Sequence, residues 1–348
     1  MSADSVRLTS LAHGGGCGCK IAPALLAELL AELPEGLRPP ELLVGTENGD
    51  DAAVWQLNDR QALVATTDFF MPIVDDPFDF GRIAATNALS DVYAMGARPI
   101  FALALVGMPI DKLAPAVIRQ ILAGGQEACR QAGILVAGGH SIDSVEPIYG
   151  LVALGLVDPT KILRNDRARA GDVLILGKPI GIGILSAALK KEALAPEAYR
   201  RMVELTTRLN TAGPDLATLA GVHAATDVTG FGLLGHLWEV CRGSRLRARL
   251  DYDRVPILPE AQALVGQGFA TGASKRNWAS YGANVAIPES WAETRRTLLC
   301  DPQTSGGLLV ACAPEAAADV LALFVRHGSP EAAIIGSLGP GQPGIDAA

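Results

Sequence analysis

Apolar residues recur along the first half of the chain at two different spacings, which separates helices from strands. Apolar positions repeating every three to four residues predict helices, and brief apolar runs between polar turns predict strands. The predicted helices cover residues 21–33, 82–95 and 113–132. The predicted strands cover residues 52–57, 62–66, 100–106, 134–137 and 149–157. This mixed order predicts an α/β or α+β fold.

The pattern changes near residue 158. Residues 158–172 hold three arginines, one lysine and few apolar residues, which is typical of an exposed connector. Beyond it, strands are predicted over 173–176 and near 222–226 and 307–312, and helices near 182–192, 198–219 and 231–242. We expect a glycine-rich segment over residues 1–20, a first domain over 21–157 and a second domain over 158–348. The tail segment 339–344, GPGQPG, is expected to be disordered.

Composition narrows the class of protein. The 348 residues include 29 Lys and Arg against 37 Asp and Glu, a net charge of −8. This weighs against non-specific binding of nucleic acid, which needs clustered positive charge. Hydrophobic residues make up 49% of the chain, but the longest uncharged apolar stretch, 99–110, is too short to cross a bilayer. We therefore expect no membrane span.

The cysteines indicate a reducing compartment. Six are present, and only Cys17 and Cys19 are close in sequence, so they do not form a dense disulfide framework. The N-terminus carries Asp4 and Arg7 and has no continuous apolar core, so it does not match a secretory signal. We therefore expect a cytoplasmic protein.

The densest chemical signal is the segment GGGCGCK at residues 14–20. Its glycines let backbone N–H groups approach a ligand closely. Lys20 is expected to lower the pKa of the Cys17 and Cys19 thiols and to supply a charge for phosphate. The segment is not a P-loop, because Cys19 stands where that motif has glycine. A flexible terminus with incidental cysteines stays open, as does a metal site, although two thiols alone cannot complete one for zinc.

Carboxylates stand at turns and strand ends throughout the chain. Asp68 ends a strand-like run, and Asp227 does the same before several glycines. Asn87 and Asp91 are four residues apart, so they share a helix face that is otherwise apolar, where an unpaired acid is costly. The turn-like segment GTENGDDAAV adds Asn48, Asp50 and Asp51. Any one of these acids can be a turn former, but together they predict sites for a hard cation such as Mg²⁺.

Three glycine segments allow more than one interpretation. Gly138-Gly139-His140-Ser141 follows a predicted strand and is either an ordinary turn or a set of donors for a phosphate or nucleoside. Residues 301–307, DPQTSGG, are expected to form a tight turn before a strand. Residues 230–235, GFGLLG, match G-x-G-x-x-G but lack a clear βαβ unit around them. We interpret these last glycines as a helix start close to a metal-bound phosphate.

Several segments, taken in order, carry a family resemblance: HGGGCGCK, NGDDAAV, TTD, NALSDVYAMGARP, AGGHS, TDVTGFGLLGH and DPQTSGGLL. They resemble the selenophosphate synthetase (selenide, water dikinase) family from about residue 8 to residue 310. The wider superfamily includes aminoimidazole ribonucleotide synthetase and thiamine-monophosphate kinase. It shares the aspartate and glycine segments but not the GCGCK-type loop. Some family members carry selenocysteine where this chain has Cys17.

The resemblance implies a fold and a reaction. The implied fold is the two-domain one of aminoimidazole ribonucleotide synthetase, with an N-terminal mixed-sheet domain that forms a barrel across a homodimer and a C-terminal α+β domain. The implied reaction converts ATP, selenide and water to selenophosphate, AMP and phosphate, which supplies activated selenium for selenocysteine and seleno-tRNA synthesis. Mg²⁺ is the implied cofactor, and a K⁺ requirement stays open. Neither a nucleic-acid partner nor a membrane is implied.

Residue roles follow from the same resemblance. The implied Mg²⁺ ligands are Asp51, Asp91 and Asp227. The implied contacts to ATP and its metal ions are Lys20, Asn48, Gly49, Asp50, Asp68 and Asp91, with Gly139, His140 and Ser141 supplied by the partner subunit. Cys17 and Lys20 would be the catalytic pair on a mobile arm over residues 1–20. Whether Cys17 carries selenium or acts as a base stays open, as does the role of Cys19.

Two other functions compete with this interpretation. The first is another ATP-dependent phosphotransferase of the superfamily, with a small-molecule acceptor. Such an enzyme would have no need of the thiol segment. The second is a thiol carrier without catalysis that binds a soft element or metal and holds ATP only as a ligand.

Overall fold

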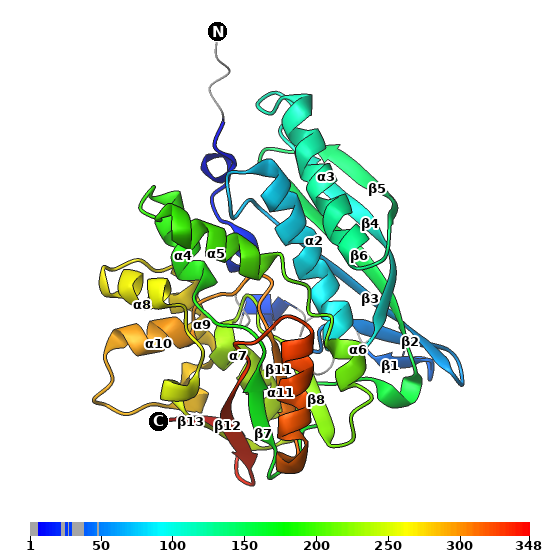
Figure 1. Cartoon of the computed structure of the whole chain (residues 1–348), viewed down its shortest axis with the longest axis vertical. Coiled ribbons are helices and arrows are strands. Elements are labelled where there is room, and N and C mark those ends of the chain that lie inside the picture. Colours follow the sequence, from blue (N-terminus) through cyan, green and yellow to red (C-terminus); the bar gives the residue numbers. More distant parts are fainter. Residues whose placement is uncertain (1–5, 22–24, 27, 30–37, 47–48) are drawn as a thin grey trace.

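The computed structural model describes residues 6–21, 25–26, 28–29, 38–46 and 49–348. These residues form two mixed β-sheets that pack against helices, which confirms the predicted α+β class (Figure 1). Of the predicted helix over 21–33, residues 25–26 and 28–29 are helical, and 22–24, 27 and 30–33 lie outside the described residues. Among the described helices, none combines the length and the apolar composition needed to cross a membrane.

The first sheet has the strand order β1-β2-β3-β6-β4-β5. Its strands are β1 Leu42–Val44, β2 Ala53–Asn58, β3 Gln61–Phe70, β4 Arg98–Met108, β5 Val136–Asp143 and β6 Ile148–Val157. Neighbours pair antiparallel except β4 and β5, which are parallel. Helices α2 Pro77–Ala94 and α3 Pro115–Gln131 lie side by side over one face of this sheet (Figure 1).

Helix α2 is the central element of the molecule. It starts at an N-cap, where the Asp76 carboxylate accepts a hydrogen bond from the Asp79 N–H, and Pro77 supplies the fixed φ of its first turn. It ends before Gly96, whose φ of +76° suits the left-handed position after a helix. Because α2 contacts β3, β4 and β6 and also β8 of the second sheet, most of its residues are buried.

The second sheet has the order β10-β13-β9-β12-β7-β11-β8. Its strands are β7 Val173–Leu176, β8 Val222–Asp227, β9 Arg247–Leu250, β10 Val285–Ala286, β11 Leu308–Cys312, β12 Ala333–Gly339 and β13 Gly344–Ala347. The helices of this half are α4 Ile182–Lys190, α5 Pro196–Thr206, α6 Gly213–Leu216, α7 Gly232–Ser244, α8 Pro259–Gly266, α9 Gly272–Tyr281, α10 Glu293–Leu299 and α11 Ala317–Arg326.

Both faces of the second sheet are covered. Ile175 and Val310 pack with Phe324 of α11 in one apolar cluster. Leu176 and Leu309, which point to the opposite face, belong to the larger core that includes residues of α4 and α7. The alternation of side chains along a strand therefore explains why these short strands are apolar throughout.

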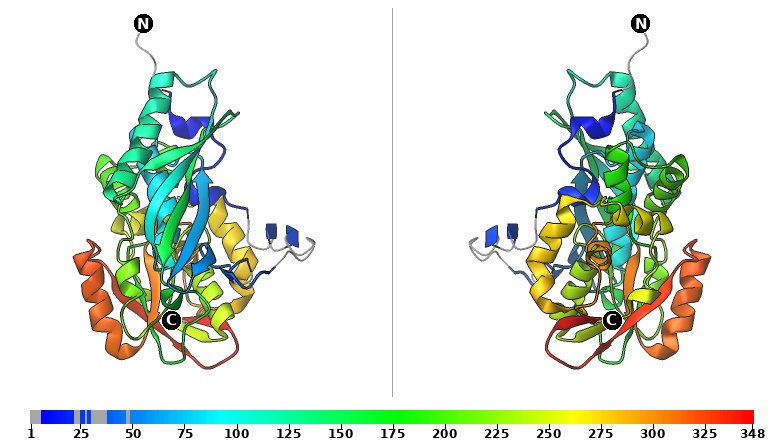
Figure 2. Two further views of the ribbon diagram at one scale, coloured as in Figure 1. Left: turned by 90° about the vertical axis from the view of Figure 1, so that its right-hand side faces the viewer. Right: turned by 90° about the vertical axis from the view of Figure 1, so that its left-hand side faces the viewer.

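The first sheet, in contrast, is covered by helices on one face only within the described part of the chain. The left view of Figure 2 looks toward its other face, over which the described residues place no helix. Phe69 and Ile142 project there and are 50% and 57% exposed, and the partly exposed Leu103 and Val152 pair across neighbouring strands. An open apolar surface of this kind is typical of an interaction site.

Two sequence predictions about the first domain are wrong. Asp68 does not end its strand, because β3 continues through two phenylalanines to Phe70 and pairs with β6 along its length. Gly138 to Ser141 do not form a turn after a strand but lie inside β5. Glycine is required at position 139 because a Cβ there would lie 2.1 Å from the carbonyl oxygen of Ala104 on β4.

Two further predictions fail in the second domain. The helix expected over 198–219 is divided into α5 and α6, and Pro214 lies in the first turn of α6, where proline is tolerated. The tail expected to be disordered connects β12 to β13 instead, and β13 pairs in parallel with β9 and β10. Ile345 of β13 is fully buried, and this burial ties down a segment whose composition alone indicates disorder.

Helices α2 and α3 cross at unusually short range. A Cβ on Gly124 of α3 would lie 2.0 Å from the carbonyl oxygen of Phe78, and one on Gly81 of α2 would lie 1.9 Å from that of Ile121. Backbone atoms on both sides leave no flexible side chain that could move aside. The position of α2 over the sheet therefore depends on glycine at this crossing.

We predict that Gly124→Ala lowers the free energy of unfolding by about 1–3 kcal/mol, because an overpacked methyl group forces the helices apart. Chemical denaturation measures this change. The matched control is Gly266→Ala at the end of α8, where an added Cβ meets nothing within 4 Å. It should be neutral or slightly stabilising, since alanine restricts the unfolded chain. Equal stability of the two variants would contradict the close crossing.

Candidate active site

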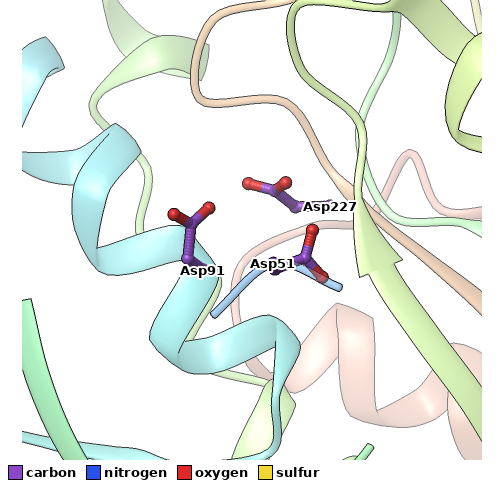
Figure 3. Close-up of side chains that lie close together, drawn as sticks. All are labelled: Asp51, Asp91 and Asp227. Atoms are coloured by element: carbon purple, nitrogen blue, oxygen red, sulfur yellow. The ribbon is translucent and has the colours of Figure 1, made fainter. Parts of the chain in front are cut away.

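Three aspartates from separate elements meet between the two sheets (Figure 3). Asp51 lies in the loop before β2, Asp91 on α2 and Asp227 at the end of β8. One carboxylate oxygen from each residue lies within 4.8 Å of the others. The structure thus brings together the three residues for which the sequence resemblance implies one metal site.

Each carboxylate is oriented by a hydroxyl group: Asp51 accepts from Thr226 at 2.8 Å, Asp91 from Thr66 at 2.6 Å and Asp227 from Ser90. The other oxygen of Asp51, Oδ2, is buried and has no hydrogen-bond partner in the described part of the chain. A buried carboxylate oxygen without a donor is costly, and a cation is the partner that would satisfy it.

The electrostatics of the cluster favour a bound cation. Burial raises the pKa of Asp51 and of Asp91 well above the usual value, and repulsion from Asp227 raises both further. Burial also raises the pKa of Asp227, although the hydrogen bond from Ser90 opposes the shift. Three oxygen-donor carboxylates around an unsatisfied atom suit a hard divalent ion such as Mg²⁺. The residues present therefore fit this class of metal.

Asp68 lies next to this cluster and contacts the glycine-rich arm. Its Oδ2 accepts hydrogen bonds from Lys20 Nζ at 3.2 Å and from Asn87 Nδ2 at 2.5 Å. Burial alone would lower the pKa of Lys20, but the acidic groups around it, Asp68 first, raise it well above its usual value. The Lys20 side chain, 37% exposed, therefore holds a positive charge at the edge of the acidic cluster.

Cys17 lies in a buried position on the same arm. Its thiol donates to Asn87 Oδ1 at 3.2 Å, and its backbone N–H donates to Thr304 Oγ1 at 3.1 Å. Lys20 acts on both thiols in the predicted direction, because its charge lowers their pKa, but other effects are larger and the net shift is upward. Burial and the charge of Asp68 raise the pKa of Cys17 well above its usual value and outweigh Lys20. Burial likewise raises the pKa of Cys19.

Contacts to both domains hold the arm in its docked position. It contains two short 3₁₀ helices, η1 Leu8–Leu11 and η2 Gly16–Cys19. Arg7 forms an ion pair with Asp75 of the first domain at 2.9 Å. Lys190 of α4 in the second domain donates to the carbonyl oxygen of Ala12 at 2.8 Å. The arm thus crosses the site as a strap between the two domains.

The loop before β2 is attached to the connector between the domains. Asp50 accepts a hydrogen bond from the backbone N–H of Asn165 at 2.8 Å, and the Asn165 side chain donates to the carbonyl oxygen of Gly49 at 3.0 Å. This pairing fixes the backbone that presents Asp51. Asn48, the first predicted nucleotide contact of this loop, lies outside the described residues.

The structure does not bring Gly139, His140 and Ser141 to the aspartates of the same chain. They lie on β5, the edge strand, and β4 and β6 separate β5 from β3, which carries Asp68. Three strand spacings correspond to about 14 Å. These three residues are exposed, so a second molecule can reach them.

Sequence reasoning missed the roles of two residues. The sequence places Asn87 on one helix face with Asp91 but does not predict its contacts with Cys17 and Asp68. It predicts a tight turn around Thr304 but not the hydrogen bond between the Thr304 hydroxyl and the arm. The available signal in both cases was a polar residue in an apolar setting, because Asn87 and Thr304 are almost fully buried.

Comparison with known proteins identifies relatives over nearly the full length. The family model "AIR synthase related protein, N-terminal domain" matches residues 49–157, and the corresponding C-terminal model matches residues 169–345. A selenide, water dikinase of Dechloromonas aromatica (strain RCB) is 62% identical over 346 residues, covering 99% of each chain. One of Burkholderia ambifaria (strain MC40-6) is 63% identical and covers 98% of this chain and 97% of its own.

Solved structures share the fold at lower identity. Thiamine-monophosphate kinase from Stenotrophomonas maltophilia K279a superposes with a TM-score of 0.63 at 24% identity, covering 93% of this chain and 95% of that one. This likeness concerns the fold alone.

We predict that a divalent cation stabilises the protein through the aspartate cluster. Mg²⁺ at a hundred times its dissociation constant should raise the free energy of unfolding by about 2.7 kcal/mol. Asp91→Asn should abolish this gain. Because the fold raises the pKa of Asp91, ionisation of this residue destabilises the metal-free protein, and the variant should therefore also be more stable without metal. This gain should grow as the pH rises from the usual pKa of an aspartate toward the raised pKa of Asp91, the range over which the unmodified protein loses stability.

Thermal denaturation with and without Mg²⁺ measures both effects. Asp59→Asn, which removes an exposed acid outside the cluster, is the control and should keep the response of the unmodified protein. An Asp91→Asn variant that still gains stability from Mg²⁺ would exclude Asp91 from the cation site.

Proposed function

The chain belongs to the selenide, water dikinase family, and we propose that its acidic site and docked arm together carry out that family's reaction. The reaction makes selenophosphate from selenide and ATP, with AMP and orthophosphate as the other products. One observation carries the assignment of the site: a buried thiol and a lysine ammonium, both from the arm, contact Asn87 and Asp68 beside a cluster of three aspartates that could hold a cation.

The charges explain why the site needs both a cation and the arm. ATP brings about four negative charges, and the carboxylates alone would repel it. We assign Asp51, Asp91 and Asp227 as ligands of Mg²⁺, which when bound would offset this repulsion and clamp phosphate oxygens. Lys20 then stabilises negative charge that develops on the transferred phosphoryl group. Its ion pair with Asp68 keeps its ammonium group at this place.

The arm gives the site a way to control water. Docked between the two domains, it covers Cys17, so the first phosphoryl transfer to selenide proceeds without competition from water. Water has to enter for the second step, in which ADP is cleaved to AMP and phosphate. We propose that the arm, residues 1–20, is docked for the first step and undocks for the second. Residues 21–157 and 158–348 form the two domains between which it moves.

We further propose that the nucleotide site is shared within a homodimer. The apolar face of the first sheet is open, and a shallow hollow on it is lined by Phe69, Leu105, Val106, Gly107, His140, Ile142 and Ile148. A second copy packed there would cover these side chains. The second copy could also bring its own β5 residues to the nucleotide site of the first copy: Gly139, His140 and Ser141. Within one chain, these residues lie too far from the assigned nucleotide contacts Lys20, Asp50 and Asp68.

The proposal places the protein in the reducing cytoplasm. All six cysteines are free thiols, and apart from Cys19 they are buried. A disulfide-forming compartment would put the reactive thiol of the arm at risk, whereas selenide itself persists only under reducing conditions.

The homodimer predicts a solution mass of about twice 36.2 kDa by light scattering. Ile142→Glu places a charge on the exposed sheet face, on the edge strand β5, and should shift the protein toward the monomer. Val325→Glu is the matched control, because Val325 is also 57% exposed but lies on α11 of the other domain. Loss of the dimer in both variants, or in neither, would argue against this interface.

The reaction itself is tested by anaerobic ³¹P NMR of the full chain with ATP, Mg²⁺ and selenide. We expect selenophosphate, AMP and orthophosphate to appear together, and only when selenide is present. Cys17→Ser should abolish selenide-dependent turnover, because its thiol is buried at the acidic cluster. Cys19→Ser should retain most activity, because the Cys19 thiol donates to the carbonyl oxygen of Gly16 within the arm, a bond that a serine hydroxyl can also make.

The outcomes separate the competing functions. ADP as the final product, or turnover that ignores selenide, would indicate a different phosphotransferase with another acceptor. Selenium bound stoichiometrically without formation of AMP would indicate a thiol carrier. Full activity of Cys17→Ser would remove that thiol from the chemistry.

A further inference from the structure

The segment 301–307 connects α10 to β11 and forms the surface on which the arm rests. Its Thr304 hydroxyl accepts the hydrogen bond from the Cys17 backbone N–H at 3.1 Å. The preceding arm residue, Gly16, lies directly against the same hydroxyl, because a Cβ on it would be 2.3 Å from Thr304 Oγ1. Gly16 also has a φ of +54°, a conformation that favours glycine. The fit between arm and segment is therefore one of shape as well as hydrogen bonding.

The backbone next to Thr304 is held in a strained conformation. Ser305 has a φ of +50°, which costs a non-glycine residue free energy and persists only when the surroundings enforce it. Its carbonyl oxygen accepts from Lys178 Nζ at 2.9 Å, and its hydroxyl donates to the carbonyl oxygen of Ile83 at 3.2 Å. The buried Lys178 also donates to the carbonyl oxygen of Arg208 at 2.6 Å, so its position is itself fixed.

Asn87 connects this strained backbone to the thiol. Its Oδ1 accepts from the Ser305 N–H at 2.7 Å and from the Cys17 thiol at 3.2 Å. The Ser305 donor fixes which end of the amide faces Cys17, because only the oxygen can accept. Cys17 is thus held at two points: its backbone by Thr304 and its thiol by Asn87.

The same segment also supports the aspartate cluster. The Gln303 N–H donates to the carbonyl oxygen of Thr229, just beyond Asp227. Asn210 donates to the Gly306 carbonyl oxygen and to Ser90 Oγ, both at 2.8 Å, and Ser90 in turn donates to Asp227. A single rigid segment therefore fixes both the arm and one of the assigned cation ligands.

We propose that Thr304 is the positioning residue that holds the arm, and with it Cys17, in the docked state. It acts through Cys17 and does not contact the reacting atoms itself. The strained backbone at Ser305 fixes the position of the neighbouring Thr304 hydroxyl, which accepts the hydrogen bond from the arm. This inference rests on the proposed function for its catalytic consequence, but the docking itself can be measured without turnover.

The test compares Thr304→Val, which keeps the side-chain shape but removes the acceptor, with Thr304→Ser, which keeps the hydroxyl. The readout is the rate at which iodoacetamide alkylates Cys17 in the full chain, followed by peptide mass spectrometry without selenide. Because alkylation requires the arm to undock, loss of one hydrogen bond should accelerate it two- to tenfold in Thr304→Val. Thr304→Ser should stay close to the unmodified protein.

Steady-state kinetics gives a second readout. Thr304→Val should lower kcat for selenide-dependent turnover by a smaller factor than it accelerates alkylation, because the docked arm remains the major state. It should leave KM for ATP nearly unchanged, since the nucleotide contacts assigned outside the arm stay in place. The matched control is Thr218→Val, an exposed threonine whose hydroxyl bonds only to the nearby Asp215 carbonyl oxygen. It should change neither quantity.

The results distinguish this inference from the proposed function. Alkylation of Cys17 at the unmodified rate in Thr304→Val would overturn the inference, whatever the enzyme produces. Faster alkylation that Thr304→Ser does not share would support it, even if the chain made no selenophosphate and the proposed function failed. A rise in KM for ATP equal to the fall in kcat/KM would also overturn it, because Thr304 would then act on nucleotide binding.

Discussion

Repulsion among buried carboxylates is the constraint on which the rest of this structure depends. Asp51, Asp91 and Asp227 come from a loop, from α2 and from β8, and they face one another between the two sheets, with Asp68 of β3 beside them. Bringing such charges together opposes folding through desolvation and repulsion. The tight glycine crossing of α2 with α3 and the closely packed core supply the rigidity that holds them in place.

The arm adds a positive charge and a thiol to this acidic site. It brings one ammonium group to the edge of the acidic cluster and one thiol into a buried position beside it. Its supports come from both domains: Asp75 from the first, and Lys190 and Thr304 from the second. Relative movement of the domains would therefore change the contacts that hold the arm. The position of Cys17 thus depends on both domains and not on one loop.

Sequence periodicity predicted the features that depend on a few neighbouring residues, such as helix faces and strand ends. The spacing of Asn87 and Asp91 placed both correctly on one helix face, and the strand before Asp227 was correctly expected, since periodicity and turn residues act over a few positions. Residues whose roles arise from long-range contact were missed. Thr304 lies 287 positions from Cys17, and burial reversed the expected direction of the Cys17 pKa shift. Neither effect leaves a periodic signal in the chain.

The burial of Cys17 also affects how readily its thiol is oxidised when no substrate is bound. Oxidants such as hydrogen peroxide react with thiolates, and a buried thiol of raised pKa keeps its proton. In the docked state, Cys17 is therefore sheltered from conversion to a sulfenic acid, while the less buried Cys19 is the thiol that an oxidant meets first. The docked arm therefore separates the two thiols, because an oxidant that reaches Cys19 still leaves the Cys17 thiol protonated and covered.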